Sequence, residues 1–422
     1  MFLEDLERFN TWWTTGSVRK ELLKPYKRKL YFEVQKYIKK RQIVMIYGLR
    51  RVGKTTLLLQ IIDELLKNNN PKNILFFSFD EKTFDVKEVL EFYQKNVLNK
   101  TFDEIDNKIY VFFDEIQKVD DWENKLKVYY DLYPKIKFFI SSSASLKLRK
   151  KSRESLSGRI IDFLLKPLSF EEFLEMLGKD LKSIKKNINL WKRELMPLFY
   201  KFVKFGMFPE LVFEEDEEFA RRYLLESVVE RIIYKDILEE LYIKDVELLK
   251  KLIYIIARNP GMLVNFERLA EDLGRDKRTI ANYFEYLEFS LLVKFVFNYR
   301  ESQIASYRKL KKAYFATPNL IFALNPNFND ILPKIIENVV LVHSEARFFF
   351  RNSFEVDFLL EENTKIIGVE VKLNANEVSQ LKKFVLKFKS KVKDVFIIDL
   401  EEEKIIDEIR VVPIWKWLLI QK

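Results

Sequence analysis

Cysteine is absent from this chain of 422 residues, and histidine occurs once, as His343. Without cysteine there can be no disulfide, no thiolate zinc site and no cysteine nucleophile. A single histidine also excludes histidine-based catalytic triads and the HExxH type of zinc site, so we interpret His343 as a helix-surface or core residue. Any catalysis must therefore use carboxylates, Lys, Arg, Ser or Thr, together with a hard metal ion held by oxygen ligands.

Long apolar runs are also missing, because no uninterrupted apolar stretch reaches the length of about 18 residues that a membrane helix needs. The first residues, MFLEDLERFNTWW, are acidic and aromatic and do not resemble a signal peptide. We therefore expect a soluble, cytoplasmic protein with no membrane partner. The composition, 48% hydrophobic and 33% charged, is typical of a globular protein, and the length indicates several domains. The net charge of +10 favours an anionic partner such as nucleic acid only weakly, since the charges are mixed along the chain.

A glycine-rich loop with a lysine follows the apolar run at residues 43–47. The run predicts a strand, Gly48-x-x-x-x-Gly53-Lys54-Thr55 follows it, and TLLLQIIDELL continues as a helix. This is the Walker A pattern in its strand–loop–helix context, in which main-chain N–H groups cradle phosphate at the helix N-terminus. Lys54 would reach the β- and γ-phosphate oxygens of ATP, and the Thr55 hydroxyl would bind Mg²⁺. The loop residues expected to contact the nucleotide are Gly48, Leu49, Arg50, Arg51, Val52, Gly53, Lys54, Thr55 and Thr56.

Two carboxylates end a second apolar run. Residues 109–113 are consecutively apolar, which predicts a strand buried on both faces, and Asp114 and Glu115 follow directly. At this position after a Walker A loop, the pair is typical of a Walker B motif. Asp114 would hold Mg²⁺ through water and complete the metal site with Thr55, and Glu115 would polarise the attacking water as general base.

Further runs at residues 73–80 and 159–169, with helices between them, predict a doubly wound parallel sheet. The run KIKFFISSSAS predicts a strand between the Walker A and Walker B strands. There the hydroxyl of Ser141 or Ser142 would sense the γ-phosphate, unless these residues form only a serine-rich loop; Ser142 is counted among the nucleotide contacts. Arg159 would reach the γ-phosphate of its own or a neighbouring subunit as a catalytic residue, or is an ordinary surface arginine.

After Pro167 the pattern becomes helical. Residues 219–242 repeat apolar residues at spacings of three and four, which predicts a long amphipathic helix in a lid over the nucleotide. Residues 246–300 predict helix, turn, helix and strand in the order of a winged helix-turn-helix. If this module binds DNA, the contacts would come from Arg275, Lys277, Arg278 and Asn282. A protein–protein module is the alternative, and Glu285 and Glu288 would keep the end of the third helix away from phosphates.

The last part of the chain predicts strand, helix, hairpin, helix and strand, the order of a restriction-endonuclease-like core. Glu370 and Lys372 alternate with valines on one strand of the hairpin, so both point to the same face, and Asp357 lies on the partner strand. Two carboxylates would bind Mg²⁺ and Lys372 would stabilise the developing charge, while Glu337 from the preceding helix would complete the metal shell. A solvated β-ribbon with charged outer residues is the alternative.

Several motifs occur in a fixed order along nearly the whole chain: YGLRRVGKTTLL, FFDEIQKVDDWE, LSGRIIDFLLKPLSFEEFLE, KFGMFPE, RIIYKDI, LAEDLGRDKRTIANYFEYLE, and FEVDFLL with VEVKL. In this combination the chain resembles the archaeal-type AAA+ ATPases with a fused carboxy-terminal endonuclease-like domain. The resemblance implies ATP and Mg²⁺ as cofactors and a multidomain α/β fold with a PD-(D/E)XK-like last domain. The domains implied are a P-loop AAA+ core (1–166), a helical lid (167–243), a winged helix-turn-helix (244–305) and a restriction-endonuclease-like domain (306–422).

The chain departs from that family at two places. Ser141-Ser142-Ser143 stands where Thr-Gly-Ser is frequent, which leaves the choice of the γ-phosphate sensor open. Met207 replaces a second glycine after Gly206, which concerns a structural turn. Two hypotheses follow. The first is an ATPase that couples ATP hydrolysis to DNA binding and DNA cleavage. The second is a nucleotide-dependent switch that binds a protein partner or another copy of itself and carries an inert nuclease-like domain.

Overall fold

The computed structural model describes residues 2–80, 84–143, 155–238, 243, 245–300, 306 and 310–420. By its internal contacts the chain divides into two units, residues 1–166 and residues 167–422. Within the described ranges, no helix is both long enough and apolar enough to span a bilayer.

The amino-terminal unit is built on a parallel sheet whose strands match the apolar runs of the sequence. The described strands are β1 (Ile43–Tyr47), β2 (Ile74–Ser78), β3 (Ile109–Asp114), β4 (Ile136–Ser142) and β5 (Ile160–Leu164). They pair in parallel in the order β2-β3-β4-β1-β5. All residues of β1, β3 and β4 are buried, as in a sheet covered on both faces. The prediction of a strand between the Walker A and Walker B strands is confirmed, because β4 lies between β1 and β3.

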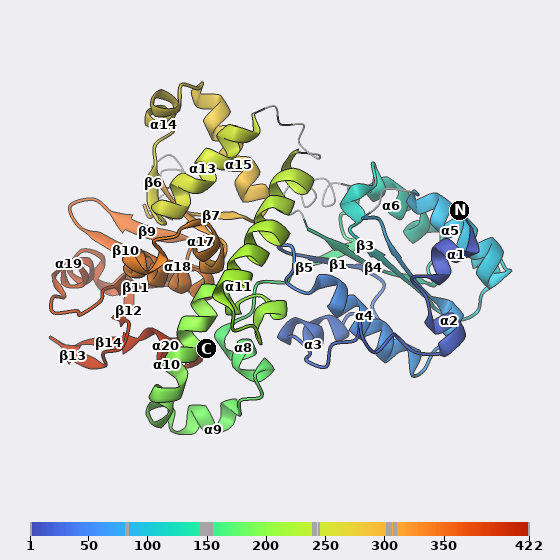
Figure 1. Ribbon diagram of the computed structural model, residues 1–422, viewed down its shortest axis with the longest axis horizontal. Helices are drawn as coiled ribbons and strands as arrows, with labels where there is room; N and C mark the ends of the chain where they lie inside the picture. Colours follow the sequence, from blue (N-terminus) through green and yellow to red (C-terminus); the bar gives the residue numbers. More distant parts are fainter. Residues whose placement is uncertain are drawn as a thin grey trace. The chain divides into compact units, whose positions relative to one another are not determined.

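Helices cover both faces of this sheet. In the described part of the unit they are α1 (Leu3–Glu7), α2 (Trp12–Thr15), α3 (Lys29–Gln35), α4 (Lys54–Leu66), α5 (Val86–Tyr93) and α6 (Trp122–Leu132). Figure 1 shows α3 and α4 on one side of the sheet and α6 on the other. Because the strands are parallel, the loops after β1, β3 and β4 all lie at the same edge of the sheet, where ligands of open α/β sheets bind.

Two glycines of the loop after β1 are required by space and by backbone conformation. A Cβ atom on Gly48 would lie 2.2 Å from the main-chain oxygen of Leu165, so any side chain there would displace the residue that follows β5. Gly53 has a φ of 98°, and Arg51 has a φ of 65° in the same loop. Helix α4 begins at Lys54, so the loop ends on a helix N-terminus whose N–H groups lack helical partners.

The carboxy-terminal unit begins with helices. Its described helices are α8 (Phe170–Met176), α9 (Leu181–Lys186), α10 (Lys192–Lys201), α11 (Glu217–Leu224), α13 (Val246–Arg258), α14 (Phe266–Leu273), α15 (Lys277–Phe289), α17 (Pro318–Leu324), α18 (Leu332–Ser344), α19 (Ser379–Phe388) and α20 (Ile414–Ile420). Helix α11 continues through wide π-helical turns at 225–229 and 232–238. The predicted long helix is therefore helical over most of its described part, and 239–242 lie outside the described residues.

The described strands of this unit form a nine-stranded sheet in the order β13-β14-β12-β11-β10-β9-β7-β8-β6. Its strands are β6 (Met262–Val264), β7 (Val293–Asn298), β8 (Lys311–Phe315), β9 (Phe348–Arg351), β10 (Glu355–Glu362), β11 (Lys365–Val371), β12 (Val392–Asp399), β13 (Lys404–Ile406) and β14 (Ile409–Pro413). Strand β8 is antiparallel to β6 and β7, and β7 is parallel to β9. The boundary predicted between residues 305 and 306 therefore falls inside one continuous sheet, because β8 pairs back with strands that precede it.

The last part of the unit follows the predicted order of elements. Helix α18 is followed by the antiparallel strands β9, β10 and β11, then by α19 and β12, and β12 is parallel to β11. A core of phenylalanines and aliphatic residues, including Phe350, Phe384 and Phe388, packs between α19 and these strands. The sequence VVPIWKWLLI ends β14 and forms α20.

Candidate functional site

The Lys54 ammonium lies inside the loop that follows β1. Its Nζ donates hydrogen bonds to the main-chain oxygens of Gly48 and Leu49, at 3.1 and 3.0 Å. The side chain is almost completely buried, and its Nζ lies 3.9 Å from a carboxylate oxygen of Glu115. A buried cation held by carbonyl oxygens at a helix N-terminus is suited to an anionic ligand such as a phosphate chain.

Asp114 and Thr55 meet at the edge of the sheet. The Thr55 hydroxyl donates to Asp114 Oδ2 at 2.8 Å, and the Ser141 hydroxyl donates to Asp114 Oδ1. Burial, followed by the neighbouring charge of Glu115, raises the pKa of Asp114 to about 6. Hydroxyl and carboxylate oxygens are the ligands that Mg²⁺ prefers, so this donor set fits the magnesium ion that accompanies a bound nucleotide.

Glu115 is held in a left-handed backbone conformation, with a φ of 53°. Gln117 Nε2 donates to Glu115 Oε2 at 2.5 Å and to Ser143 Oγ at 2.9 Å. Burial alone would raise the pKa of Glu115, but the nearby Lys54 and the hydrogen bond from Gln117 outweigh it and lower that pKa. The carboxylate therefore remains ionised at neutral pH, as a general base requires.

The two serines at the end of β4, Ser141 and Ser142, make different contacts. Ser141 contacts Asp114 and also accepts a hydrogen bond from the main-chain N–H of Glu115 at 3.2 Å. The main-chain oxygen of Ser142 accepts from the N–H of Gly48 at 3.3 Å. Because successive side chains of a strand point to opposite faces, Ser141 lies on the face of β4 that meets the carboxylate pair. The contact of Ser142 with the nucleotide stays a prediction.

Two contributors to this site were not predicted. The buried Arg28 donates to the main-chain oxygen of Val52, at 3.0 Å, and to that of Lys166, at 2.8 Å, and so ties the loop to the end of β5. Gln117 orients Glu115, as described above. The Gln of FFDEIQ, two residues after the glutamate, is a local signal that could have been recognised; Arg28 offers none, because its partners are distant in sequence.

Arg159 does not reach the phosphate loop of its own chain. Its main-chain oxygen accepts from the N–H of Ile43, at the start of β1, whereas the loop follows the end of β1. A strand of five residues separates the two ends by roughly 16 Å, at about 3.3 Å per residue. The guanidinium instead pairs with Asp131 at 2.8 and 3.1 Å. The predicted contact with its own nucleotide is therefore not supported, and a contact with a neighbouring subunit stays a prediction.

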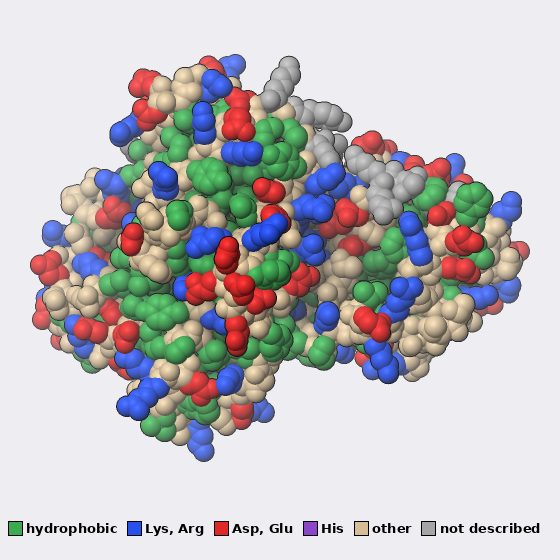
Figure 2. Space-filling view, viewed as in Figure 1, with side chains coloured by type: hydrophobic (Ala, Val, Ile, Leu, Met, Phe, Trp, Pro, Cys, Tyr) green, Lys and Arg blue, Asp and Glu red, His purple; other side chains and the backbone are tan. Residues whose placement is uncertain are grey.

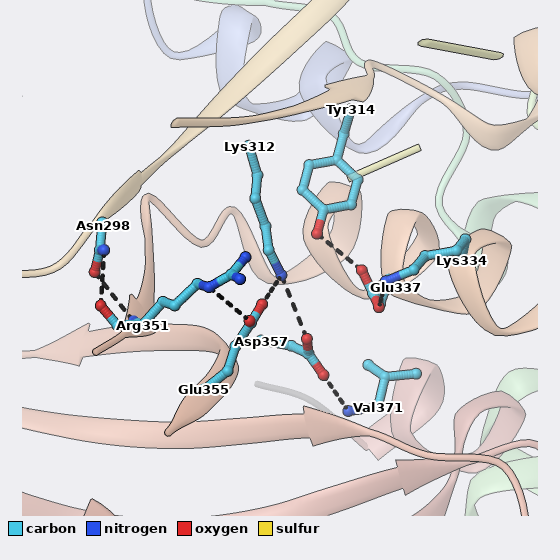
Figure 3. Close-up of polar contacts among 9 residues, drawn as sticks. All are labelled: Asn298, Lys312, Tyr314, Lys334, Glu337, Arg351, Glu355, Asp357 and Val371. Atoms are coloured by element: carbon cyan, nitrogen blue, oxygen red, sulfur yellow. Dashed lines mark hydrogen bonds and ion pairs between the residues drawn. The ribbon is translucent and has the colours of Figure 1, made fainter. Parts of the chain in front are cut away.

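The second set of predicted site residues lies in the carboxy-terminal unit, and Figure 3 shows two of them, Glu337 and Asp357. In the hairpin, Phe358 pairs with Val369, which brings Asp357 opposite Glu370, and Asp357 Oδ2 accepts from the main-chain N–H of Val371 at 3.0 Å. Lys372 Nζ lies 2.9 Å from Glu370 Oε1. The expected cross-strand placement of the two carboxylates is thus present.

Glu337 approaches the hairpin from α18. Its carboxylate accepts from the Tyr314 hydroxyl at 2.9 Å and from Lys334 Nζ at 2.5 Å. Burial raises the pKa of Glu337, as does the nearby charge of Asp357, and burial likewise raises the pKa of Glu370. Even so, no group of three or more His, Asp or Glu that could hold a metal ion occurs within the ranges that the structure describes.

A lysine that sequence reasoning missed lies among these carboxylates. Lys312 Nζ from β8 is 2.7 Å from Glu355 and 3.5 Å from Asp357. Burial alone would lower the pKa of Lys312, but Asp357, Glu337 and Glu355 together raise it. The alternation Glu355-x-Asp357 places both carboxylates on one face of β10 and could have been read from the sequence, whereas their lysine partner could not.

The predicted DNA contacts lie at the start of α15. Arg275 pairs with Asp245 at 2.8 Å and Lys277 with Glu267 at 2.6 Å, whereas Arg278 and Asn282 are exposed. On the face in Figure 2, basic and acidic side chains are interspersed over the described residues around α14 and α15, rather than gathered by sign. Two of the four predicted side chains are therefore engaged with carboxylates of their own unit.

Comparisons with protein families divide the chain into three segments. Residues 40–174 match the family described as an AAA domain. Residues 196–330 and 335–417 match two families described as domains of unknown function, DUF8612 and DUF4143. The first match covers the loop after β1 and the carboxylates Asp114 and Glu115. The parallel five-stranded sheet with its helices fits an AAA+ fold.

Two curated relatives align along most of the chain. The uncharacterized protein MJ1544 of Methanocaldococcus jannaschii is 30% identical over 407 residues, which cover 90% of this chain and 88% of that protein. An uncharacterized protein of Haemophilus influenzae is 28% identical over 398 residues, which cover 89% of this chain and 94% of that protein. Among solved structures, the ORC1 protein of Aeropyrum pernix in complex with DNA is 14% identical, covers 72% of this chain and 92% of that one, and has a TM-score of 0.31, too low for any conclusion.

Proposed function

We propose that this chain, which belongs to the family of the uncharacterized protein MJ1544 of Methanocaldococcus jannaschii, binds ATP with Mg²⁺ in its AAA domain and hydrolyses it. The observation that carries the proposal is the hydrogen bond from Thr55 to Asp114 beside the buried ammonium of Lys54. These groups come from two separate strand ends, and together they provide a cation for phosphate and oxygen ligands for magnesium.

The residues divide the chemistry among them. Main-chain N–H groups at the start of α4 and the Lys54 ammonium bind and neutralise the phosphates. Thr55 and Asp114 would hold Mg²⁺, and the bound ion would offset the charge that develops on the transferred phosphoryl group. Glu115 orients the attacking water and accepts its proton, and the hydrogen bond from Gln117 fixes the direction of that carboxylate.

Substitution of Glu115 tests the catalytic half of this proposal. Glu115→Gln should retain ATP affinity within a few fold, because Lys54 and the loop are untouched, and should lower turnover by roughly 10²–10⁴-fold, the usual contribution of a general base. Turnover would be followed by phosphate release and affinity by equilibrium binding of a fluorescent ATP analogue. Glu91→Gln, an exposed glutamate of α5, is the matched control and should turn over normally. Unchanged turnover in Glu115→Gln would refute the base role.

The second half of the proposal is that the nucleotide state is coupled to DNA binding. The order α13, β6, α14, α15, β7, β8, with an antiparallel β6-β8-β7 sheet, supports a winged helix-turn-helix in which α15 is the recognition helix. The exposed Arg278 and Asn282 near its start would contact DNA. Duplex DNA should then stimulate ATP turnover, and an absence of both stimulation and salt-dependent binding would exclude DNA as the partner.

One observation favours a protein partner instead. The pairs Arg275–Asp245 and Lys277–Glu267 occupy two of the cations that phosphates would need. On this alternative, the chain is a nucleotide-dependent switch that binds a protein or another copy of itself, and Arg159 would act on a neighbouring copy. Light scattering with and without ATP separates the alternatives, because a self-associating switch changes its mass with nucleotide.

A further inference from the structure

Four carboxylates gather in the carboxy-terminal unit. Three of them, Glu337 from α18 and Glu355 and Asp357 from β10, are drawn in Figure 3. The fourth, Glu370, lies on β11 opposite Asp357. Glu337 and Glu370 are nearly fully buried, at 5% and 6% exposed. Carboxylates so close together in a poorly hydrated place need counter-charges, since an unpaired buried charge is strongly destabilising.

Lys312 supplies the central counter-charge. Its side chain extends from β8, is 4% exposed, and places Nζ 2.7 Å from Glu355 and 3.5 Å from Asp357. The ammonium also lies 5.1 Å from the centre of the Phe349 ring, whose negative face attracts cations. Lys312 is therefore held by two carboxylates and an aromatic ring, and not by solvent.

Three further cations of the chain pair with carboxylates of the cluster. Lys334 pairs with Glu337 at 2.5 Å and Lys372 with Glu370 at 2.9 Å. The second oxygen of Glu355 lies 3.5 Å from the guanidinium of Arg351. Four carboxylates are thus matched by Lys312, Lys334, Arg351 and Lys372, which leaves the cluster without net charge.

The hydrogen-bonding capacity of the carboxylates is also used. Asp357 accepts from the N–H of Val371 in addition to Lys312, and Glu337 accepts from the hydroxyl of Tyr314 in addition to Lys334. Among the described residues, Glu370 Oε2 is the one carboxylate oxygen of the cluster that is buried without a hydrogen-bond partner. One such oxygen does not make a site for Mg²⁺, which requires near-octahedral oxygen coordination.

We infer that Lys312 is the resident cation of this carboxylate cluster, and that the nuclease-like domain holds no divalent metal while Lys312 is in place. The residues predicted as a magnesium site do not fit that ion. The cluster instead fastens β8 to the β10–β11 hairpin and to α18 by ion pairs. This inference does not depend on ATP hydrolysis, because every residue in it lies in the unit of residues 167–422.

Manganese binding to the full chain without nucleotide tests the inference. Free Mn²⁺ would be measured by electron paramagnetic resonance, and the bound ion counted per chain for wild type and for Asp357→Asn. The two should bind the same number of ions, because in wild type Asp357 is already paired with Lys312 and is not available to a metal ion. Any ion held by Thr55 and Asp114 is common to both proteins and cancels in the comparison.

Replacement of the lysine should open the cluster. Lys312→Met keeps most of the side-chain volume and removes the charge, so the variant should bind an additional Mn²⁺ ion per chain, and Asp357→Asn in the same background should abolish that ion. Lys311→Met is the matched control, because the neighbouring Lys311 packs 3.4 Å from the centre of the Phe295 ring and not in the cluster. It should bind no more Mn²⁺ than wild type.

The stability of these variants gives a second, independent measurement. Lys312→Met should lower the melting temperature without metal, and Mn²⁺ or the added Asp357→Asn substitution should restore part of the loss, since each removes the uncompensated negative charge. If Lys312→Met does not fold, the comparison of wild type with Asp357→Asn still decides. A Mn²⁺ ion on wild type that Asp357→Asn removes would overturn the inference, as would a folded Lys312→Met that binds no more Mn²⁺ than wild type.

Discussion

Replacement of Asp114 by asparagine should change the stability of the nucleotide-free protein in a way that depends on pH. Asp114 is 4% exposed, and burial together with Glu115 raises its pKa from 3.8 to about 6. A shift of about 2 pKa units corresponds to roughly 3 kcal/mol, at about 1.4 kcal/mol per unit. Compared with the unfolded chain, the native state therefore favours the protonated form of this side chain over the ionised form by that additional amount.

The sign follows from proton binding. Because the pKa of Asp114 is higher in the folded than in the unfolded state, its contribution is fully present below about pH 3.8 and is lost as the pH rises through about 6. Asparagine carries no charge at any pH. The stability of Asp114→Asn minus that of wild type should thus rise with pH, by about 3 kcal/mol in total and by roughly half of this between pH 5 and 8. The lost hydrogen bonds to Thr55 and Ser141, at about 1 kcal/mol each, lower this stability difference equally at every pH and do not change its slope.

Glu115→Gln is the matched control, because its neighbouring carboxylate has the opposite shift. The pKa of Glu115 is lowered in the folded state, so this group contributes stability above its unfolded value of 4.5 that is lost as the pH falls. Both pH 5 and pH 8 lie above that value, so this contribution is nearly the same at the two pH values. Of the two neighbouring substitutions, Asp114→Asn should therefore give the larger pH slope in this range.

Hydrogen exchange measured by mass spectrometry is the appropriate assay, because it reports the opening of β1, β3 and β4 without requiring two-state unfolding of a chain with two units. Protection factors, corrected for the intrinsic exchange rate at each pH, convert to opening free energies. A difference between Asp114→Asn and wild type that stays flat or falls from pH 5 to 8 would refute the electrostatic reasoning. Saturating Mg-ATP should reverse the ranking, because only wild type keeps the carboxylate that is proposed to hold the metal.

Three further substitutions test the surroundings of the proposed sites. Gly48→Ala would place a Cβ 2.2 Å from the Leu165 carbonyl oxygen, so calorimetry should show a free energy of unfolding that is lower by about 1–3 kcal/mol. The variant should also bind ATP more weakly. Arg28→Met removes two buried charged hydrogen bonds, and its ATP affinity should fall by roughly tenfold if each is worth about 1.5 kcal/mol and half of that reaches the loop. If DNA is the partner, Arg278→Ala should make the slope of log binding constant against log salt concentration less steep by about one unit. Arg275→Ala should change that slope less, because its guanidinium is already paired with Asp245.

The AAA unit could be predicted closely because its signals are local. Each strand of the first sheet is a short run of apolar residues, and the loop and the carboxylate pair follow two of these runs directly. Since parallel strands bring their carboxyl ends to one edge, the pairing of Thr55 with Asp114 followed from the motifs alone. The hairpin that carries Asp357 and Glu370 was predicted in the same way, from alternation of residues along two neighbouring runs.

The sequence by itself determined the identity and local placement of the residues proposed to bind the nucleotide, because glycine spacing, apolar runs and strand alternation act over a few neighbouring positions. Only the tertiary structure decided which groups face those residues. Pairing between strands distant in sequence brings Lys312 to Asp357, 45 positions away, and Arg28 to Lys166, 138 positions away, while it leaves Arg159 at the far end of β1. Strand order and register set these contacts, and they decide whether a predicted cluster of carboxylates faces a metal ion or a lysine.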